Sequence, residues 1–380
     1  MTATATDLDV VRKRLRRFAE DEAMIESPLY AHLALAASED DDVAGLLAVA
    51  PPEFARPTLL FAAVHRLVLA EPVSDLANYY PTVGGEYGVD GVVWPTFRSF
   101  VLDRAAKVRE LVATRTTQTN EVRRAALLYP AVARAAKQAN QVSKGPIGLL
   151  ELGTSAGLLL GLDRYGYRYQ AADGEQLAAG PTKAPLVLSS VFSIADGAKR
   201  PPLPKNLAVA AKVGLDRNPI DLTDDEQLAW LEACVWADQP ERVRLLNQAA
   251  TAQVKDRPEF VTGDLVDDLA AAAARIPADL PLVVFNSHVL PYVPERRRPD
   301  FVAALAELAK ERPLWWISQE AYGAVLRLVL PDRADLDHDG TSKNTPLGVL
   351  GSVRWVDGRA EAVVLARTAA HGERIVWLAT

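Results

Sequence analysis

The spacing of apolar residues changes character near residue 143 of the chain. Before that point, apolar side chains recur with the period of helices that bury one face. After it, short apolar runs alternate with helical stretches, which is typical of a mostly parallel sheet flanked by helices. The sequence therefore predicts an N-terminal α-helical cap domain over residues 1–142 and an α/β domain over residues 143–380.

Capping and helix-breaking residues divide the first half of the chain. Thr6 precedes Asp9 with capping-box spacing, which predicts the start of the first helix. Ser27-Pro28 starts another helix, and Pro51-Pro52 interrupts the pattern again. Longer helices are predicted over residues 58–69, 97–113 and 120–136.

Polar side chains stand in a row where the helix over 120–136 is expected to begin. The row includes Gln118, Asn120 and Glu121. A plain N-cap would explain Asn120 alone, whereas a helix end that faces a ligand would explain the whole row. Tyr80, in an earlier aromatic loop, is a further candidate for substrate contact, although such residues also pack cores.

The second half contains strands separated by helices and by one long excursion. Strands are predicted over residues 147–152, 207–215, 259–262, 282–285 and 314–317. Residues 165–205 are rich in Tyr, Gly and Pro and predict an inserted hairpin or loop excursion. An Asp357-Gly358 turn between alternating runs predicts that the sheet finishes as an antiparallel hairpin.

The first predicted strand runs into a turn of small residues, Gly153, Thr154, Ser155 and Gly157. The leucine-rich residues 158–162 predict a buried helix directly after this turn. A strand, a small-residue turn and a helix let a ligand lie against bare backbone at a helix N-terminus. A tight turn without a ligand can have the same sequence, so both interpretations stay open at this point.

Polar residues also follow the later strands. In chain order, the residues at strand ends are Glu151, Asp216, Asp264, Asn286 with His288, and Glu320. In open α/β sheets the ligand binds outside the carboxyl ends of the strands, so these side chains form the candidate site.

This arrangement resembles class I S-adenosylmethionine-dependent methyltransferases, whose mostly parallel, Rossmann-like sheet ends in an antiparallel hairpin. Glu151 through Gly157 matches their glycine turn, Asp216 with Asn218 their ribose-binding strand end, and Asp264 their adenine-side acid. The resemblance implies S-adenosylmethionine as cofactor, with Asn286 on the cofactor side. A carboxylate suits a ribose diol because it accepts two strong hydrogen bonds.

An alternative assignment of the ribose ligand stays open. The excursion over 165–205 separates Asp216 from the glycine turn, so residues 167–169 are a competing second strand with Asp173 as the ribose ligand. The Asn218-Pro219 pair that follows Asp216 favours Asp216.

At finer grain, the whole chain resembles a bacterial family known as a conserved domain of unknown function. The matching stretches are QTNEV (118–122), ELGTSAGL (151–158), DRYGYRY (163–169), DRNPID (216–221) and His371-Gly372 before Trp377. Arg123, Leu159 and Ala370 depart from the family pattern, in which glycine, asparagine and proline are common at those positions. This resemblance supports the methyltransferase-like fold and implies no reaction.

His288 is the main candidate for a general base, because an unperturbed imidazole titrates close to neutral pH. Glu320, at the end of the next strand, is a second candidate for that role, and Tyr292 is a candidate for positioning the acceptor. Direct displacement of a methyl group needs mainly alignment and a deprotonated nucleophile, so few catalytic groups are required.

Composition narrows the partners and the compartment. A net charge of −7 disfavours a nucleic-acid partner, and the basic residues 12–17 are interpreted as the solvated face of a helix. Cys234 is the single cysteine, which excludes an intrachain disulfide and favours the cytosol. With neither a signal-peptide pattern nor an apolar run of membrane-spanning length, the sequence predicts a cytoplasmic protein without a membrane partner.

We expect no metal cofactor. The five histidines are scattered, and none pairs at metal-binding spacing. Residues 335–340 copy the first half of a calcium-binding loop, but Lys343 and Pro346 stand at its ninth and twelfth positions, so an acidic surface loop is expected.

Together these features predict an S-adenosylmethionine-dependent methyltransferase that acts on a small-molecule hydroxyl or amine. The alternative is a non-catalytic S-adenosylmethionine-binding or regulatory protein that has kept the fold. A nicotinamide-dependent Rossmann oxidoreductase is a poorer match, because Ser155 and Leu158 replace the second and third glycines of G-x-G-x-x-G.

Overall fold

The computed structural model describes residues 6–171, 174–337 and 348–380. The chain forms two compact units, one of Met1–Asn120 with Asp221–Leu246 and one of Glu121–Ile220 with Asn247–Thr380. This division differs from a single boundary at residue 142. Helix α8 (Arg124–Val142) packs against strands of the sheet, and the segment after Ile220 rejoins the helical unit.

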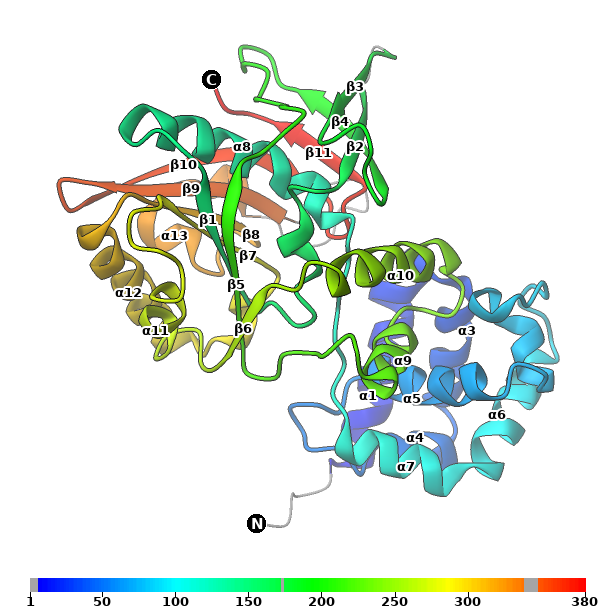
Figure 1. Ribbon diagram of the computed structural model, residues 1–380. Coiled ribbons are helices and arrows are strands. Elements are labelled where there is room, and N and C mark those ends of the chain that lie inside the picture. The colour runs from blue at the N-terminus through cyan, green and yellow to red at the C-terminus, as the bar shows by residue number, and fades with distance from the viewer. Residues whose placement is uncertain (1–5, 172–173, 338–347) are drawn as a thin grey trace. The chain divides into compact units, whose positions relative to one another are not determined.

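The first unit is helical (Figure 1). Its helices are α1 (Leu8–Arg17), α2 (Met24–Glu26), α3 (Pro28–Ala37), α4 (Asp41–Leu47), α5 (Pro57–Ala70), α6 (Val93–Asp103), α7 (Ala105–Thr114), α9 (Asp225–Ala233) and the first part of α10 (Pro240–Val254). Their apolar faces bury one core, in which Tyr30 stacks on Phe61.

The N-cap of α1 differs from the one that capping-box spacing predicted. Asp7 is the cap, and its carboxylate accepts the amides of Asp9 and Val10. The Thr6 hydroxyl instead donates to the Ala50 carbonyl at 2.8 Å. Thr6 therefore fastens the start of the chain to the unit, while the neighbouring carboxylate satisfies the helix end.

Buried polar groups tie the segment Asp221–Leu246 into the first unit. The Nδ1 atom of His65 lies 3.2 and 2.9 Å from the carbonyls of Ala233 and Val235. Burial lowers the pKa of His65 to about 4, so the ring is neutral and structural. The sulfur of Cys234 receives the backbone N–H of Gln118, and burial raises the pKa of this thiol to about 12, so it is a poor nucleophile.

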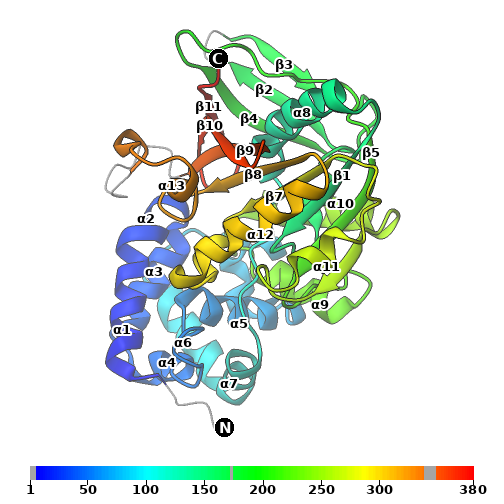
Figure 2. The same ribbon diagram turned by 90° about the vertical axis from the view of Figure 1, so that its left-hand side faces the viewer.

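The second unit is built on a mixed sheet in which parallel pairs predominate (Figures 1 and 2). Its strands are β1 (Ile147–Leu152), β2 (Gly166–Ala171), β3 (Gln176–Ala179), β4 (Val187–Ile194), β5 (Val209–Asp216), β6 (Glu259–Thr262), β7 (Leu282–Ser287), β8 (Leu314–Glu320), β9 (Gly348–Val356), β10 (Arg359–Thr368) and β11 (Arg374–Trp377). Within the described residues the order is β3-β2-β4-β11-β10-β9-β8-β7-β1-β5-β6.

Strand β1 stands where the direction of sheet growth reverses. The chain adds β5 and β6 on one side of β1 and then returns to add β7 and β8 on the other, all in parallel. The point between β1 and β7 is therefore the topological switch point, outside which ligands of open α/β sheets bind. All six residues of β1 are buried, as expected for a strand covered on both faces.

The excursion over 165–205 joins the far end of the sheet. It forms β2, β3 and β4, and β4 pairs with β11 in parallel. The antiparallel hairpin at residues 348–368 is confirmed as β9 and β10. Residues 167–169 do lie in a strand, β2, but β2 pairs with β3 and β4, whereas β5, which ends at Asp216, pairs with β1. Asp173, the ribose ligand of the competing assignment, lies outside the described residues.

Helices cover both faces of this sheet. Adjacent strand residues point to opposite faces, and on β8 the Trp315 indole donates to Gln138 of α8 whereas Trp316 contacts Phe301 of α12. Helix α8 thus covers one face, and α11 (Leu269–Ala273) and α12 (Arg298–Glu311) cover the other (Figure 2). The short α13 (Leu326–Val329) follows β8.

The buried helix predicted over 158–162 is wrong. Leu158–Gly161 form only a single 3₁₀ turn. The hydroxyl of Tyr165 donates to the Leu158 carbonyl at 2.6 Å, and its ring occupies the space beside Gly161. The chain therefore turns away towards β2 after four residues, too early for a helix terminus that could bind an anion.

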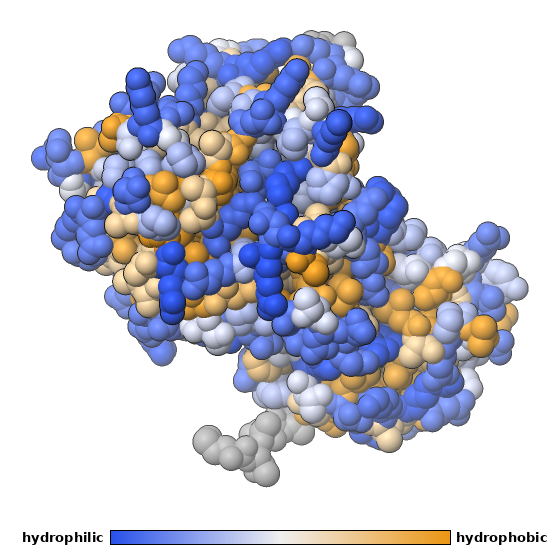
Figure 3. All heavy atoms as spheres, viewed as in Figure 1, coloured by the Kyte–Doolittle hydropathy of each residue, from blue (hydrophilic) through white to orange (hydrophobic). Residues whose placement is uncertain are grey.

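The exposed face and helix α1 carry side chains of mixed polarity. Figure 3 shows hydrophilic atoms interspersed with small hydrophobic areas over the face in view. The basic residues of α1 bind acids and carbonyls of the same unit: Arg12 binds Asp41, Arg16 binds Glu39, and Arg14 binds the carbonyls of Pro52 and Ala55. Across the described residues, no helix combines the length and apolarity that crossing a membrane requires.

In the second unit, tyrosine hydroxyls of the DRYGYRY stretch donate hydrogen bonds to buried backbone carbonyls. Pro130 lies inside α8 and has no N–H to donate to the carbonyl of Ala126, four residues earlier. The hydroxyl of Tyr169 donates to that carbonyl at 2.9 Å, and both residues are fully buried. Tyr167 likewise donates to the Leu162 carbonyl. This stretch therefore has a structural role.

Replacing Tyr169 by Phe tests that role. The substitution leaves the Ala126 carbonyl buried without its donor, so we expect the free energy of unfolding to fall by about 1–3 kcal/mol in urea denaturation. In a Pro130→Ala background the restored N–H supplies the missing bond, and the cost should shrink. Tyr167→Phe is the matched control and should cost the same in both backgrounds. Equal costs for Tyr169→Phe in the two backgrounds would refute the pairing.

Candidate functional site

The glycine turn after β1 is held by protein contacts on both sides. The N–H of Gly153 donates to the Leu215 carbonyl at 2.8 Å, which fastens the turn to β5. Gly153 and Gly157 have φ of +68° and +67°, which side chains disfavour. The room beside Gly153 is filled by Val289, and that beside Gly157 by Phe260. The two glycines are thus required by backbone conformation and packing, with or without a ligand.

Glu151 supports this turn from inside the protein. Its carboxyl accepts the hydroxyl of Thr154 at 2.8 Å and is almost fully buried. Burial raises the pKa of Glu151 well above its usual range, and the nearby charge of Asp216 adds to the shift. Burial thus disfavours the charged form of Glu151, and its bond to Thr154 supports the turn.

Asp216 is brought to the same turn by the pairing of β5 with β1. Its Oδ2 accepts the backbone N–H of Ser155 at 2.8 Å, and its Oδ1 accepts that of Asn218 at 2.8 Å. Ser155 adopts a left-handed conformation with φ of 48°, which the bond to Asp216 holds in place. A carboxylate has about four acceptor positions, so each oxygen keeps one position beyond these amides.

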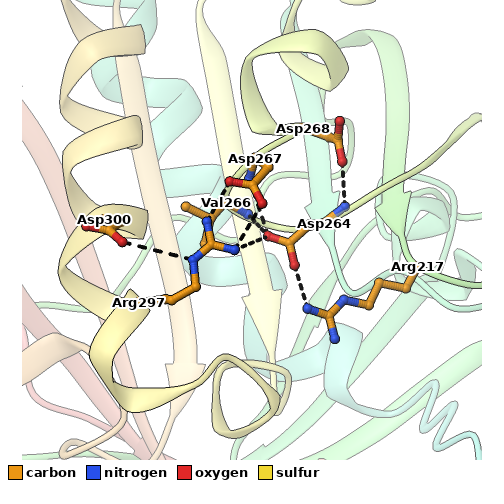
Figure 4. A network of polar contacts seen from close by, with 7 residues as sticks. All are labelled: Arg217, Asp264, Val266, Asp267, Asp268, Arg297 and Asp300. Carbon is orange, nitrogen blue, oxygen red and sulfur yellow. Dashed lines mark hydrogen bonds and ion pairs between the residues drawn. The ribbon is translucent and has the colours of Figure 1, made fainter.

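Asp264 lies in an ion-pair network at the end of β6 (Figure 4). Its Oδ2 binds Arg217, and its Oδ1 accepts the amides of Val266 and Asp267 and lies 3.5 Å from Arg297. Burial acts to raise the pKa of Asp264, but the hydrogen bonds outweigh it and the net pKa is lowered. The lowered pKa favours the ionised carboxylate, whose Oδ1 is occupied by the protein, whereas Oδ2 carries one bond, to Arg217.

Asn286 and Glu320 form one buried hydrogen-bonded group at the ends of β7 and β8. The Trp316 indole donates to Asn286 Oδ1 at 2.7 Å, and Asn286 Nδ2 donates to Glu320 Oε1 at 2.7 Å. The backbone amides of Val289 and Leu290 donate to the same Oε1 at 2.8 and 3.2 Å. Asn286 therefore contacts Glu320, and its predicted cofactor-side role stays a prediction.

The second oxygen of Glu320 is different. Oε2 is buried and has no hydrogen-bond partner among the residues that the structure describes. Burial raises the pKa of Glu320 to about 7, although the hydrogen bonds to Oε1 and the charge of Arg124 act to lower it. A carboxyl with this pKa exchanges protons near neutral pH.

His288 lies at the same edge of the sheet in a left-handed conformation, with φ of 55°. Its backbone N–H donates to the Gln319 carbonyl at 3.1 Å, and its Nε2 lies 3.1 Å from Gln319 Nε2. Burial lowers the pKa of His288 to about 3, and the charge of Arg124 adds to the shift. The premise that His288 has an unperturbed pKa is therefore wrong, and the neutral ring is a weak base.

The remaining candidates are divided between the units. Tyr292 is exposed, on the 3₁₀ turn that follows His288. Glu121 belongs to the second unit, is buried, and accepts the backbone N–H of Arg123. Gln118, Asn120 and Tyr80 belong to the first unit, and Tyr80 is part of its core.

Two stretches that resembled family motifs meet in the second unit. Gly372 lies against Arg123, whose backbone would be 2.5 Å from a Cβ at that position. The neighbouring Arg124 is buried and donates to the carbonyl of Ala370 at 2.8 Å. The start of α8 is therefore fixed to the β10–β11 turn, and the Arg124 charge acts on both His288 and Glu320.

Sequence reasoning missed several members of this group. Arg124 lies two residues after the end of the QTNEV stretch, so proximity to that motif was an available signal. Gln319 precedes Glu320 at the end of a predicted strand, a second signal. The sequence offered no signal for Trp316, because a tryptophan inside an apolar run is interpreted as a core residue.

The structure also bears on metal binding. Within residues 6–171, 174–337 and 348–380, no group of three or more His, Cys, Asp or Glu side chains could hold a metal ion. The calcium-like loop lies partly outside this range. In its described part, Asp335 pairs with Arg333 and Asp337 with Arg327.

Comparison with known proteins identifies the family. A family model described as an uncharacterized protein conserved in bacteria (DUF2332) matches residues 12–377. The chain belongs to this family. No curated protein is significantly similar to the chain. Family membership confirms the whole-chain resemblance noted above, and it carries no statement about methyl transfer or its cofactor.

Replacing Glu320 by Gln in this family member tests the perturbed carboxyl. The pKa of Glu320 is about 7 in the folded protein, and its ordinary value is 4.5. At any pH between these two values, the folded protein keeps a proton on Glu320 that the unfolded chain has lost. The resulting stability is present at low pH and is lost as pH rises towards the folded pKa. We expect wild type to lose about 2–3 kcal/mol more than Glu320→Gln between about pH 5 and about pH 8.

Urea denaturation at a series of pH values measures this difference. Glu307→Gln is the matched control, because Glu307 is an exposed partner of Lys310 on α12. Parallel pH profiles for wild type and Glu320→Gln would mean that the carboxyl titrates normally.

Proposed function

We propose that the protein is an S-adenosylmethionine-dependent methyltransferase acting on a hydroxyl or amine of a small molecule. The observation that carries this proposal is the Asp216 carboxylate beside the switch point of the sheet. The amides of Ser155 and Asn218 fix its plane and occupy one position on each oxygen. One acceptor position per oxygen remains for the two hydroxyls of a ribose.

The other cofactor-side residues fit this proposal unequally. Glu151 and Thr154 support the turn that presents the Ser155 amide to Asp216. Asp264 fits a contact with an adenine amino group less well, because amides and Arg297 occupy its Oδ1 and Arg217 already binds its Oδ2. Bound S-adenosylmethionine would supply an electrophilic methyl group on a sulfonium cation, which an acidic environment favours over a pyrophosphate.

Glu320 is the residue that this proposal assigns to proton transfer. Its pKa of about 7 suits a general base, and the buried Oε2 is held ready by the three bonds to Oε1. His288 is better suited to donate a hydrogen bond than to take a proton, because its pKa is about 3. Tyr292, exposed beside them, remains the candidate for positioning the acceptor.

A second candidate is a non-catalytic S-adenosylmethionine-binding or regulatory protein. Asp264 favours this candidate, because the acid expected on the adenine side is part of an internal ion-pair network with Arg217 and Arg297. The two candidates share the ribose contact at Asp216 and differ in whether Glu320 takes a proton from an acceptor.

Isothermal titration calorimetry with S-adenosylhomocysteine tests the proposed cofactor site on the full chain. We expect binding that Asp216→Ala weakens at least about tenfold, because charge-assisted hydrogen bonds are lost. Asp267→Ala is the matched control: this exposed aspartate pairs with Arg297, and its loss should leave the affinity unchanged. Absence of binding to wild type at millimolar concentration would contradict the proposal.

Turnover separates the two candidates. Wild type and Glu320→Gln would be incubated with methyl-labelled S-adenosylmethionine and pools of small hydroxyl and amine compounds. Label transfer by wild type that Glu320→Gln abolishes supports the methyltransferase. Cofactor binding without transfer to any pool favours the non-catalytic protein.

A further inference from the structure

A chain of hydrogen bonds runs from Trp316 on β8 through Asn286 on β7 and back to Glu320 on β8. The indole N–H lies 2.7 Å from Asn286 Oδ1, and Asn286 Nδ2 lies 2.7 Å from Glu320 Oε1. An indole nitrogen can donate a hydrogen bond but cannot accept one. The Asn286 oxygen must therefore face Trp316, and its NH₂ group must face Glu320.

This orientation determines which oxygen of Glu320 can carry a proton. Oε1 accepts the Asn286 side chain and the backbone N–H groups of Val289 and Leu290. Three N–H groups directed at one oxygen leave no room for a proton there. The O–H of the protonated carboxyl is therefore on Oε2, which is buried and has no partner in the described part of the chain.

We propose that Asn286 and Trp316 are positioning residues that fix the exchangeable proton of Glu320 on Oε2. A catalytic role for this proton rests on the proposed function. The location of the proton on Oε2 does not. In the proton transfer, the O–H or N–H bond of the acceptor breaks and a new O–H bond forms at Oε2. The electron pair stays on the acceptor atom, and Glu320 becomes neutral.

The groups around Glu320 act on this proton from three elements. Arg124 at the start of α8 favours the ionised carboxylate, while burial favours the neutral acid. His288, after β7, is neutral and therefore adds no charge. Thr368 at the end of β10 is uncharged and binds Gln319, the neighbour of Glu320. Trp316 and Asn286 carry no charge, so their effect on the carboxyl is one of hydrogen-bond direction.

A neighbouring residue provides a matched pair of variants. Trp315 and Trp316 are both buried on β8, and each donates its indole N–H to a side-chain amide oxygen. Trp315 donates to Gln138 on α8, away from Glu320. Trp316→Phe and Trp315→Phe therefore remove the same kind of bond, and only the first is connected to Glu320.

Carbon-13 NMR titration of the Glu320 carboxyl carbon, assigned with Glu320→Gln, tests the proposal in the full chain without cofactor. Trp316→Phe frees the Asn286 amide to rotate, and we expect the pKa of Glu320 to rise by about one unit. Trp315→Phe should leave it unchanged. Asn286→Asp places a second carboxyl beside Oε1, and we expect two coupled steps, one raised by more than about one unit. Equal titrations in the two tryptophan variants would overturn the proposal.

A measurement on the wild-type protein does not depend on whether the variants fold. The Asn286 side-chain amide protons should shift with the same midpoint as the Glu320 carboxyl carbon, because the amide donates to that carboxyl. Amide signals that stay constant through the titration would overturn the proposal. The titration needs no S-adenosylmethionine. If the protein does not bind the cofactor, the proposed function is wrong, but the location of the Glu320 proton can still be tested in this way.

Discussion

The register of β1 against its two neighbours is the constraint on which the candidate site depends. Leu152 pairs with Leu215 on β5 and with Asn286 on β7, so these parallel strands end at one level. The turns that follow place Ser155 against Asp216. The contact between Asn286 and Glu320 depends in addition on the register of β7 against β8, where a slip of one residue would turn Asn286 to the other face. The polar group at the sheet edge is therefore a product of backbone pairing.

Two kinds of carboxyl result at this edge. Asp216 and Asp264 receive backbone amides, and Asp264 also binds arginines, so their charges are compensated. Glu151 and Glu320 are buried with uncharged donors, and burial raises the pKa of both. A diol needs an ionised acceptor, whereas proton exchange near neutral pH needs a perturbed acid. The proposed function assigns the first role to Asp216 and the second to Glu320.

Buried parallel strands were the most predictable part of the fold. The runs 147–152 and 259–262 have the same bounds as β1 and β6. Strand β1 is a fully buried apolar run closed by a polar turn, whereas β6 is partly exposed and is bounded by the polar Gly263-Asp264 turn. The place of β2 to β4 at the far end of the sheet was not predictable, since it depends on pairing with β11, almost at the other end of the chain. The lowered pKa of His288 and the raised pKa of Glu320 both depend on burial, which no local pattern reveals.

We propose above that Asp216 binds the ribose of a nucleoside cofactor, and amide NMR spectra can detect this contact. On addition of S-adenosylhomocysteine, we expect large shifts of the Ser155 and Asn218 amides, which donate to the two Asp216 oxygens. Adenosine, which has the same ribose, should shift the same two amides. If saturating S-adenosylhomocysteine leaves both amide signals unmoved, Asp216 is not the ribose ligand, whatever shifts occur elsewhere.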